Sequence, residues 1–196
     1  MADVFLTLKQ LENLYWQLTM QILGYDPADY ENPKKSTPVR IAWPADGSPA
    51  WKRDEDVIFL RIGEDDDPFN KLRDTTFTQS NEDYATQATS YTRVLNVHWV
   101  CYGPNSYDNA FRIRNALYDT KQKEFLGVNK IYLIPAIESP RRSPELFVGQ
   151  WWERTNLMAK FNELIKLDTP APYLKSATVE VTDQHANTDL LTINKP

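Results

Sequence analysis

The stretch VHWVCYGPNSYDNAFRIRNALYDT, residues 97–120, decides the fold because it joins a strand pattern to a helix pattern through a sharp turn. It continues a run from residue 89 in which apolar and polar positions alternate, as they do in a strand with one buried face. His98 falls on the polar face of this strand. The residues predicted to face the core are Leu95, Val97, Trp99 and Cys101.

The second half of the stretch predicts a helix. The Gly-Pro-Asn sequence at 103–105 ends the strand, Ser106 is placed to act as the N-cap, and Asp108 complements the helix dipole. The helix should run to about Lys123, with Gly127 after its end. Its predicted buried residues are Tyr107, Ala110, Ile113 and Leu117.

His98 and Cys101 are the first candidates for chemistry, since Cys101 is the only cysteine and His98 is one of two histidines. At positions i and i+3 of a strand their side chains leave opposite faces of the sheet. They therefore cannot share a metal ion or form a nucleophile and base. We expect a buried thiol and a histidine on the other face.

The rest of the chain adds one helix and several strands. Apolar residues at steps of three and four predict a helix over 2–24, and a proline-containing loop follows over 25–38. Residues 151–162 are predicted as a strand, although the later half also fits a helix. The other predicted strands are 39–43, 56–62, 75–80, 130–137 and 176–183.

This order predicts a single α+β domain over residues 1–196, with a mostly antiparallel sheet flanked by the N-terminal helix and the central helix. Residues 183–196 are expected to form a polar C-terminal tail.

Composition narrows the class of protein. The formal net charge of −5 argues against a protein that coats nucleic acid, because phosphate binding requires clustered Lys and Arg. A single cysteine excludes an internal disulfide and fits a reducing compartment. The N-terminus lacks a signal-peptide pattern and no apolar run is long enough to cross a bilayer, so synthesis in the cytoplasm is expected.

No catalytic, cofactor-binding or metal-binding motif is found. The acidic run GEDDDP at 63–68 lacks the spacing of a calcium loop and is expected to be a solvated turn. Glu153 and Glu163 are expected to be solvated charges. We therefore predict that the protein is not an enzyme and needs no cofactor. The alternative is a small hydrolase or nuclease that uses scattered acidic residues and His98.

Consecutive tryptophans mark one candidate interaction surface. On a strand, Trp151 would face the core with Leu157, and Trp152 would face outward beside Arg154, two residues further on. Such a pair of aromatic ring and guanidinium is enriched at protein interfaces. The alternative, weighted equally, is that a second layer of the same domain covers Trp152.

Two other segments are candidate contact surfaces. Arg141 and Arg142 lie between prolines in the loop at 139–144, where they form either a solvated loop or a contact to an acidic partner or to passing DNA. The polar stretch TTFTQSNEDYATQATSYT at 75–92 suits an exposed hairpin or an edge strand that pairs with a neighbouring subunit. Its Tyr84 and Tyr91 are candidate interface residues.

Three segments within 89–163 together resemble the tailed-bacteriophage neck or tail terminator (tail completion) family: VHWVCYGPNSYDNAFRIRNAL, IPAIESPRRSPELF and GQWWERTNLMAKFN. Members of the family show a strand ending in an aromatic-Tyr-Gly-Pro turn, a helix with Ala and Ile-Arg, a proline-rich loop and a Trp-x-x-Arg strand. In this sequence the turn reads Cys-Tyr-Gly-Pro at 101–104. Where the family has an acidic residue two places after that arginine, this sequence has Asn156.

The resemblance implies a structural virion protein that forms a ring, expected to be a hexamer, on the last ring of the tail tube. It would stop tube polymerisation and join the tube to the head-side connector, with DNA passing through without specific binding. The expected partners are other copies of the chain, the tail-tube protein and the connector, with no membrane. A head-completion or tail-tube adaptor protein is the alternative within the same structural class.

Overall fold

The computed structural model describes residues 4–30, 37–42, 50–79, 84–172, 176–182 and 188–194. The chain divides into two compact units, one made of residues 1–3, 73–90 and 166–196 and the other of residues 4–72 and 91–165. The helices and most of the core belong to the second unit, which we call the core unit. The single-domain prediction stays a prediction.

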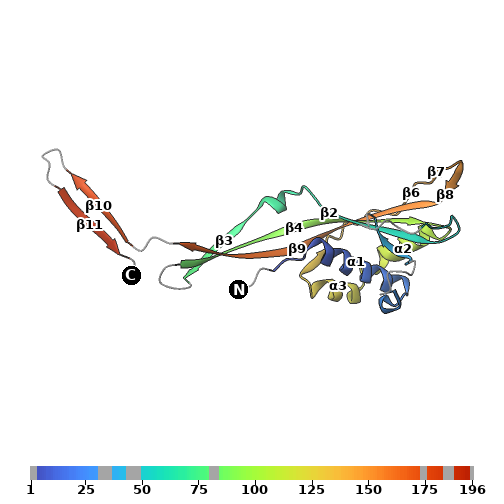
Figure 1. The fold of residues 1–196 in the computed structure, drawn as a ribbon, viewed down its shortest axis with the longest axis horizontal. Helices are drawn as coiled ribbons and strands as arrows, with labels where there is room; N and C mark the ends of the chain where they lie inside the picture. The colour runs from blue at the N-terminus through green and yellow to red at the C-terminus, as the bar shows by residue number, and fades with distance from the viewer. Residues whose placement is uncertain are drawn as a thin grey trace. The chain divides into compact units, whose positions relative to one another are not determined.

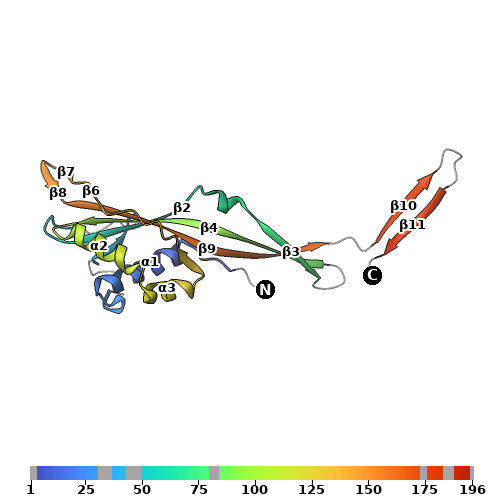
Figure 2. The same cartoon turned by 180° about the vertical axis from the view of Figure 1, so that it is seen from behind.

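The core unit contains a twisted sheet with helices on one side. Its strands follow the order β1 (Val39–Ile41), β2 (Val57–Glu64), β4 (Tyr84–Tyr102), β9 (Arg154–Pro172) and β5 (Ile131–Leu133). β1 and β2 are parallel, whereas β2 with β4 and β5 with β9 are antiparallel. The α+β class with a mostly antiparallel sheet is therefore confirmed. Figures 1 and 2 show the three helices on the same side of strands β2, β4 and β9.

Helix α1 (Leu8–Leu23) confirms the N-terminal helix but begins later than predicted. Thr7 and Gln10 form a capping box that fixes its start, and Gly24 ends it in the left-handed conformation with φ of 88°. Leu11, Tyr15 and Leu18 face the core, as their spacing predicts.

The predicted inward face of β4 is confirmed. The side chains on this face are at most 2% exposed: Leu95, Val97, Trp99 and Cys101. The Trp99 indole reaches α1 and donates its Nε1 hydrogen to Thr19 Oγ1 at 2.9 Å, while Tyr15 packs on Phe161 of β9 with ring centroids 5.1 Å apart. The core therefore lies between the helices and the inward faces of β4 and β9.

The strand-turn-helix corner is held by Asp56, a residue that the sequence did not single out. Its carboxylate accepts hydrogen bonds from the backbone N and the Nδ2 of Asn105, at 3.0 and 2.8 Å. Gly103 has φ of 102°, and a Cβ there would overlap Asp56. The turn therefore requires glycine both for its backbone angle and for the close approach of the loop before β2.

Three details of the predicted central helix are wrong. Helix α2 (Ser106–Ala116) has Asn105 at its N-cap, while Ser106 is buried inside the helix and its hydroxyl lies 3.2 Å from Thr155 Oγ1. A second helix, α3 (Thr120–Gly127), begins after Asp119, whose extended backbone interrupts the helical path. Tyr107 is 44% exposed rather than buried, because α2 turns only its Ala110 and Ile113 face toward the core.

Short elements connect the main ones. Two 3₁₀ turns span Pro27–Tyr30 and Pro68–Lys71. The predicted strand after the basic loop is confirmed as β8 (Gln150–Trp152) followed by β9. The loop at 139–144 itself contains β6 (Arg141–Arg142), which pairs with β9, and β7 (Glu145–Phe147) pairs with β8 in a separate two-stranded sheet.

The other unit contains two hairpins. β3 (Asp74–Gln79) pairs antiparallel with residues 85–90 of β4, which confirms the predicted polar hairpin within the residues described. β10 (Ser176–Thr182) pairs with β11 (Thr188–Asn194) over seven residue pairs. The segment predicted as a polar tail thus contains strand β11, which includes the short apolar patch at 190–193.

Candidate protein-interaction surface

A layer of aromatic side chains covers part of the helix-free face of the core unit. Because Trp99 and Cys101 point toward the helices, Tyr102 leaves the opposite face of β4. Its ring centroid lies 5.7 Å from that of Trp51 and 5.9 Å from that of Phe59 on β2. Trp152 of β8 lies 5.9 Å from Trp51, and Phe147 of β7 lies 6.1 Å from Trp152. We call these five residues the aromatic layer.

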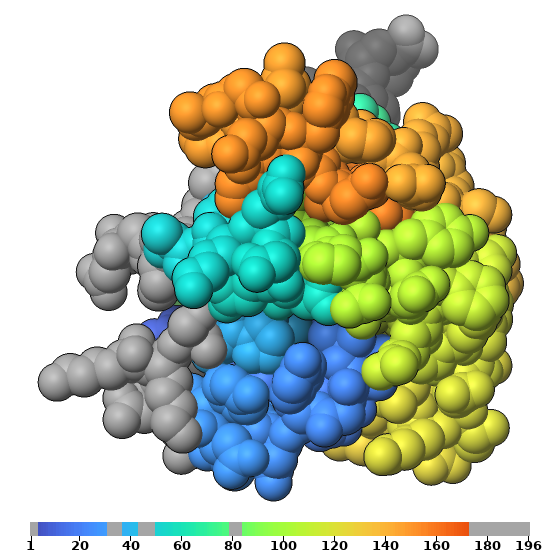
Figure 3. All heavy atoms as spheres, turned by 90° about the vertical axis from the view of Figure 1, so that its right-hand side faces the viewer, coloured from blue at the N-terminus to red at the C-terminus, as the bar shows by residue number. Residues whose placement is uncertain are grey.

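The aromatic layer encloses a recess of about 280 Å³. It is lined by Ala50, Trp51, Tyr102, Glu145, Phe147 and Trp152. The space-filling view in Figure 3 shows the segment that includes the β7–β8 hairpin, in orange, resting against the cyan segment that includes residues 50–60. Three segments far apart in sequence therefore build the recess: the loop before β2, the end of β4 at Tyr102, and the β7–β8 hairpin.

An ion pair frames the recess. Glu145 Oε2 accepts hydrogen bonds from Tyr102 Oη and from Arg154 Nη1, both at 2.9 Å. Burial, followed by the hydrogen bond to Glu145, raises the pKa of Tyr102. The Arg154 guanidinium lies 5.9 Å from the Tyr102 ring centroid, and that of Arg40 lies 6.0 Å from the Trp51 ring. Cation-π contacts thus already involve two rings of the layer.

The two consecutive tryptophans take the reverse of their predicted environments. Trp151 is 64% exposed, and Trp152 is half-buried in the aromatic layer. The two side chains do lie on opposite faces of the strand, as alternation requires. The buried face of β9 begins at Thr155, however, and the preceding strand β8 pairs with β7 instead of lying over the helices. A second layer of the same domain therefore partly covers Trp152, which was one of the two alternatives. Arg154 contacts the ring of Tyr102.

The tip of the β7–β8 hairpin is apolar and exposed. Leu146 and Trp151 are cross-strand partners, 57% and 64% exposed, and Val148 at the tip is 84% exposed. The loop residues Val148 and Gly149 have φ of 48° and 72°. Positive φ at both positions suits a tight hairpin turn, but it is unfavourable for a β-branched residue such as Val148.

The other predicted contact residues are distributed over both units. Arg141 and Arg142 are exposed, and Arg142 Nη2 lies 2.9 Å from Glu153 Oε2. Tyr91 belongs to the core unit and is half-buried. Tyr84, 47% exposed, belongs to the other unit. Within the core unit, the structure brings Trp152 and Arg154 to the aromatic recess.

His98 and Cys101 lie on opposite faces of β4, as predicted. Cys101 is fully buried, and burial raises the pKa of its thiol to about 12. Desolvation, with a smaller effect of the neighbouring Arg61 charge, lowers the pKa of His98. These two residues do not form a shared site.

The carboxylates of the acidic run at 63–68 contact both neighbouring residues and Lys160 on β9. Asp65 pairs with Lys160, Asp66 lies 2.9 Å from Lys71 Nζ, and Asp67 Oδ1 accepts from the Phe69 backbone N at 2.9 Å. Among the residues that the structure describes, no group of three or more His, Cys, Asp or Glu side chains is arranged to hold a metal ion. Within the same residues, no helix is long and apolar enough to cross a membrane.

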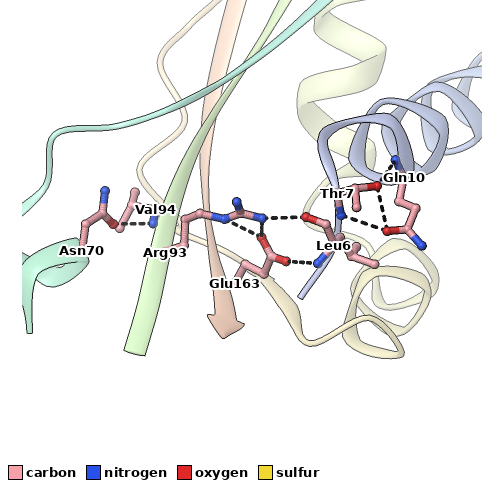
Figure 4. Close-up of polar contacts among 7 residues, drawn as sticks. All are labelled: Leu6, Thr7, Gln10, Asn70, Arg93, Val94 and Glu163. Carbon is pink, nitrogen blue, oxygen red and sulfur yellow. Dashed lines mark hydrogen bonds and ion pairs between the residues drawn. The ribbon is translucent and has the colours of Figure 1, made fainter. Parts of the chain in front are cut away.

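The prediction for Glu163 is wrong, because this side chain is 1% exposed rather than solvated. Its Oε2 lies 2.6 Å from Arg93 Nη2, and its Oε1 accepts from the Leu6 backbone N at 2.9 Å. Figure 4 shows Glu163 between Arg93 and Leu6. Arg93 also donates to the Leu6 carbonyl at 3.0 Å. The pair fastens the segment before α1 to the inward faces of β4 and β9. The sequence did carry a signal for this pair, because Arg93 and Glu163 each occupy a position that alternation assigns to the apolar face of a strand.

Fold and surface together define a small α+β protein with an aromatic layer outside its main core. A family model described as phage neck terminator protein matches residues 9–192, and the chain belongs to this family. The predicted family resemblance is thus confirmed, over far more of the chain than residues 89–163. The family is a structural one, so the chain is a component of the phage virion. A comparison with curated proteins found no match.

Proposed function

We propose that the protein assembles as a closed ring, a hexamer, that caps the tail tube, stops its polymerisation and joins it to the head-side connector. The family match over residues 9–192 is the observation that carries this proposal. In a closed ring with head-to-tail contacts, each subunit presents two different surfaces. The exposed β7–β8 hairpin and the polar β3–β4 hairpin each offer such a surface.

The residues proposed to contact partners are Trp152, Arg154, Arg141, Arg142, Tyr84 and Tyr91. The net charge of −5 supports a conduit through which DNA slides without specific binding. Synthesis would take place in the host cytoplasm, before incorporation into the virion. The proposed activity is structural, with no catalytic step.

Native mass spectrometry of the purified protein, alone and with tail-tube protein, tests the ring. Electron microscopy of the same mixtures measures tube length. We expect a hexamer and tubes that stop growing when the protein is added. A strictly monomeric protein that leaves tube length unchanged would sink the proposal.

An adaptor of the head-completion or tail-tube kind is the second candidate, because the same family features suit a neighbouring ring. Labelling the protein in assembled particles distinguishes the two. A terminator lies directly on the last ring of the tube, whereas an adaptor is separated from it.

A further inference from the structure

Two residues that line the recess have indole N–H groups that lack acceptors among the described residues. Trp51 Nε1 and Trp152 Nε1 are both shielded from solvent, and neither has a hydrogen-bond partner within the part of the chain that the structure describes. Both residues line the recess. Because a shielded donor without an acceptor is unfavourable, an occupant that brings carbonyl oxygens would be favoured after a small rotation of either indole.

The recess is also electrically balanced. Among the described residues that line it, the one acidic side chain is Glu145, which is paired with Arg154 at 2.9 Å. Arg154 and Arg40 already lie near the rings of Tyr102 and Trp51. A cationic occupant would meet these guanidinium groups, and an anionic one would compete with Glu145 for Arg154. Charge complementarity therefore favours a neutral, largely apolar occupant.

The residues that line the recess also favour an occupant with few backbone N–H groups. An ordinary peptide would bring backbone N–H groups into a recess whose lining carboxylate, Glu145, is already paired with Tyr102 and Arg154. Proline has no backbone N–H, carries a compact apolar ring and holds its neighbours extended. Aromatic-lined grooves that donate to carbonyls suit such segments.

We propose that this recess binds an extended, proline-containing segment of a partner protein. The proline ring would pack between Trp51, Tyr102 and Trp152, and the carbonyl before it would accept from an indole N–H. The volume of about 280 Å³ lies just below the usual range for ligand pockets, so the recess holds a few residues rather than a domain. This contact is independent of ring formation and goes beyond the proposed function.

The test uses the full chain and a fluorescently labelled oligoproline peptide, with binding followed by fluorescence anisotropy. A glycine-serine peptide of equal length is the peptide control. Trp152→Phe keeps an aromatic ring in the recess and removes one donor. Trp151→Phe is the matched control, because this neighbour is 64% exposed on the other side of the hairpin.

We expect saturable binding of oligoproline alone, about fivefold weaker for Trp152→Phe and within about twofold of the original for Trp151→Phe. Should Trp152→Phe fail to fold, Trp51→Phe tests the second donor in the same way. Absence of saturable binding, equal binding of the glycine-serine peptide, or equal weakening by both substitutions would overturn the proposal. A Trp152→Phe protein that changes its oligomeric state but not its peptide affinity would assign the recess to a second copy, and also overturn it.

Native mass spectrometry of the same samples reports ring formation separately. A protein that forms rings without binding oligoproline contradicts only the recess proposal. A protein that binds oligoproline as a monomer contradicts only the proposed ring.

Discussion

Removing either partner of the buried pair between Arg93 and Glu163 should destabilise the fold, and by different amounts. Arg93→Met leaves the carboxylate of Glu163, 1% exposed, buried without its cation. Breaking a buried pair in this way costs about 3–5 kcal/mol. Glu163→Gln leaves Arg93, which is 19% exposed and can partly reach water, so we expect a smaller loss of about 2–3 kcal/mol.

Urea unfolding followed by circular dichroism measures these losses, and the double substitution completes a thermodynamic cycle. The double variant should lose clearly less than the sum of the single losses, because neither charge is then left buried alone. Arg142→Met is the matched control, since Arg142 and its partner Glu153 are 60% and 47% exposed, and it should leave the urea midpoint nearly unchanged. Additive losses, or a larger loss for Glu163→Gln than for Arg93→Met, would refute the reasoning.

Three further predictions concern other parts of the core unit. Val148→Asn should raise the free energy of unfolding by about 1 kcal/mol, because asparagine tolerates positive φ better than a β-branched residue; an unchanged urea midpoint would contradict this. Cys101 should resist alkylation at pH 8 in the folded protein and react after unfolding, because burial raises its pKa to about 12; mass spectrometry of the adduct decides. The hydrogen bond from Lys160 lowers the pKa of Asp65 in the folded protein below its pKa in the unfolded chain. The ionised Asp65 therefore stabilises the fold at pH values above the unfolded pKa, and this stabilisation is lost as the pH falls through the folded pKa. Asp65→Asn should therefore reduce the acid-induced loss of stability in urea titrations, and an identical pH profile would count against it.

Local periodicity in the sequence was enough to predict the elements that build the core. Alternation over 89–102 identified the buried face of β4, and apolar steps of three and four identified α1. These patterns succeed because each repeats one choice of face over many residues. Precise ends were harder to predict, since Asn105 rather than Ser106 stands at the N-cap position of α2, where its backbone N donates to Asp56, far away in the sequence.

The candidate surface was less predictable, because its features depend on which strand pairs with which. Trp151 and Trp152 were correctly assigned to opposite faces, but only the pairing of β8 with β7 decides which face is covered. Likewise, Glu163 looks like an ordinary surface charge until β9 is placed beside β4, where Arg93 lies 70 residues away in sequence. Long-range pairing therefore separates an exposed charge from a buried one here.

The corner at residues 97–120 connects the core to the candidate surface. Its inward residues Trp99 and Cys101 pack under the helices, while its outward Tyr102 forms a wall of the recess. Asn105, three residues later, holds Asp56, which fixes the loop that carries Trp51 to the other wall. The same turn thus sets the angle between sheet and helix and the position of two rings of the recess. The corner that at first suggested a His-Cys site therefore positions rings of the aromatic layer.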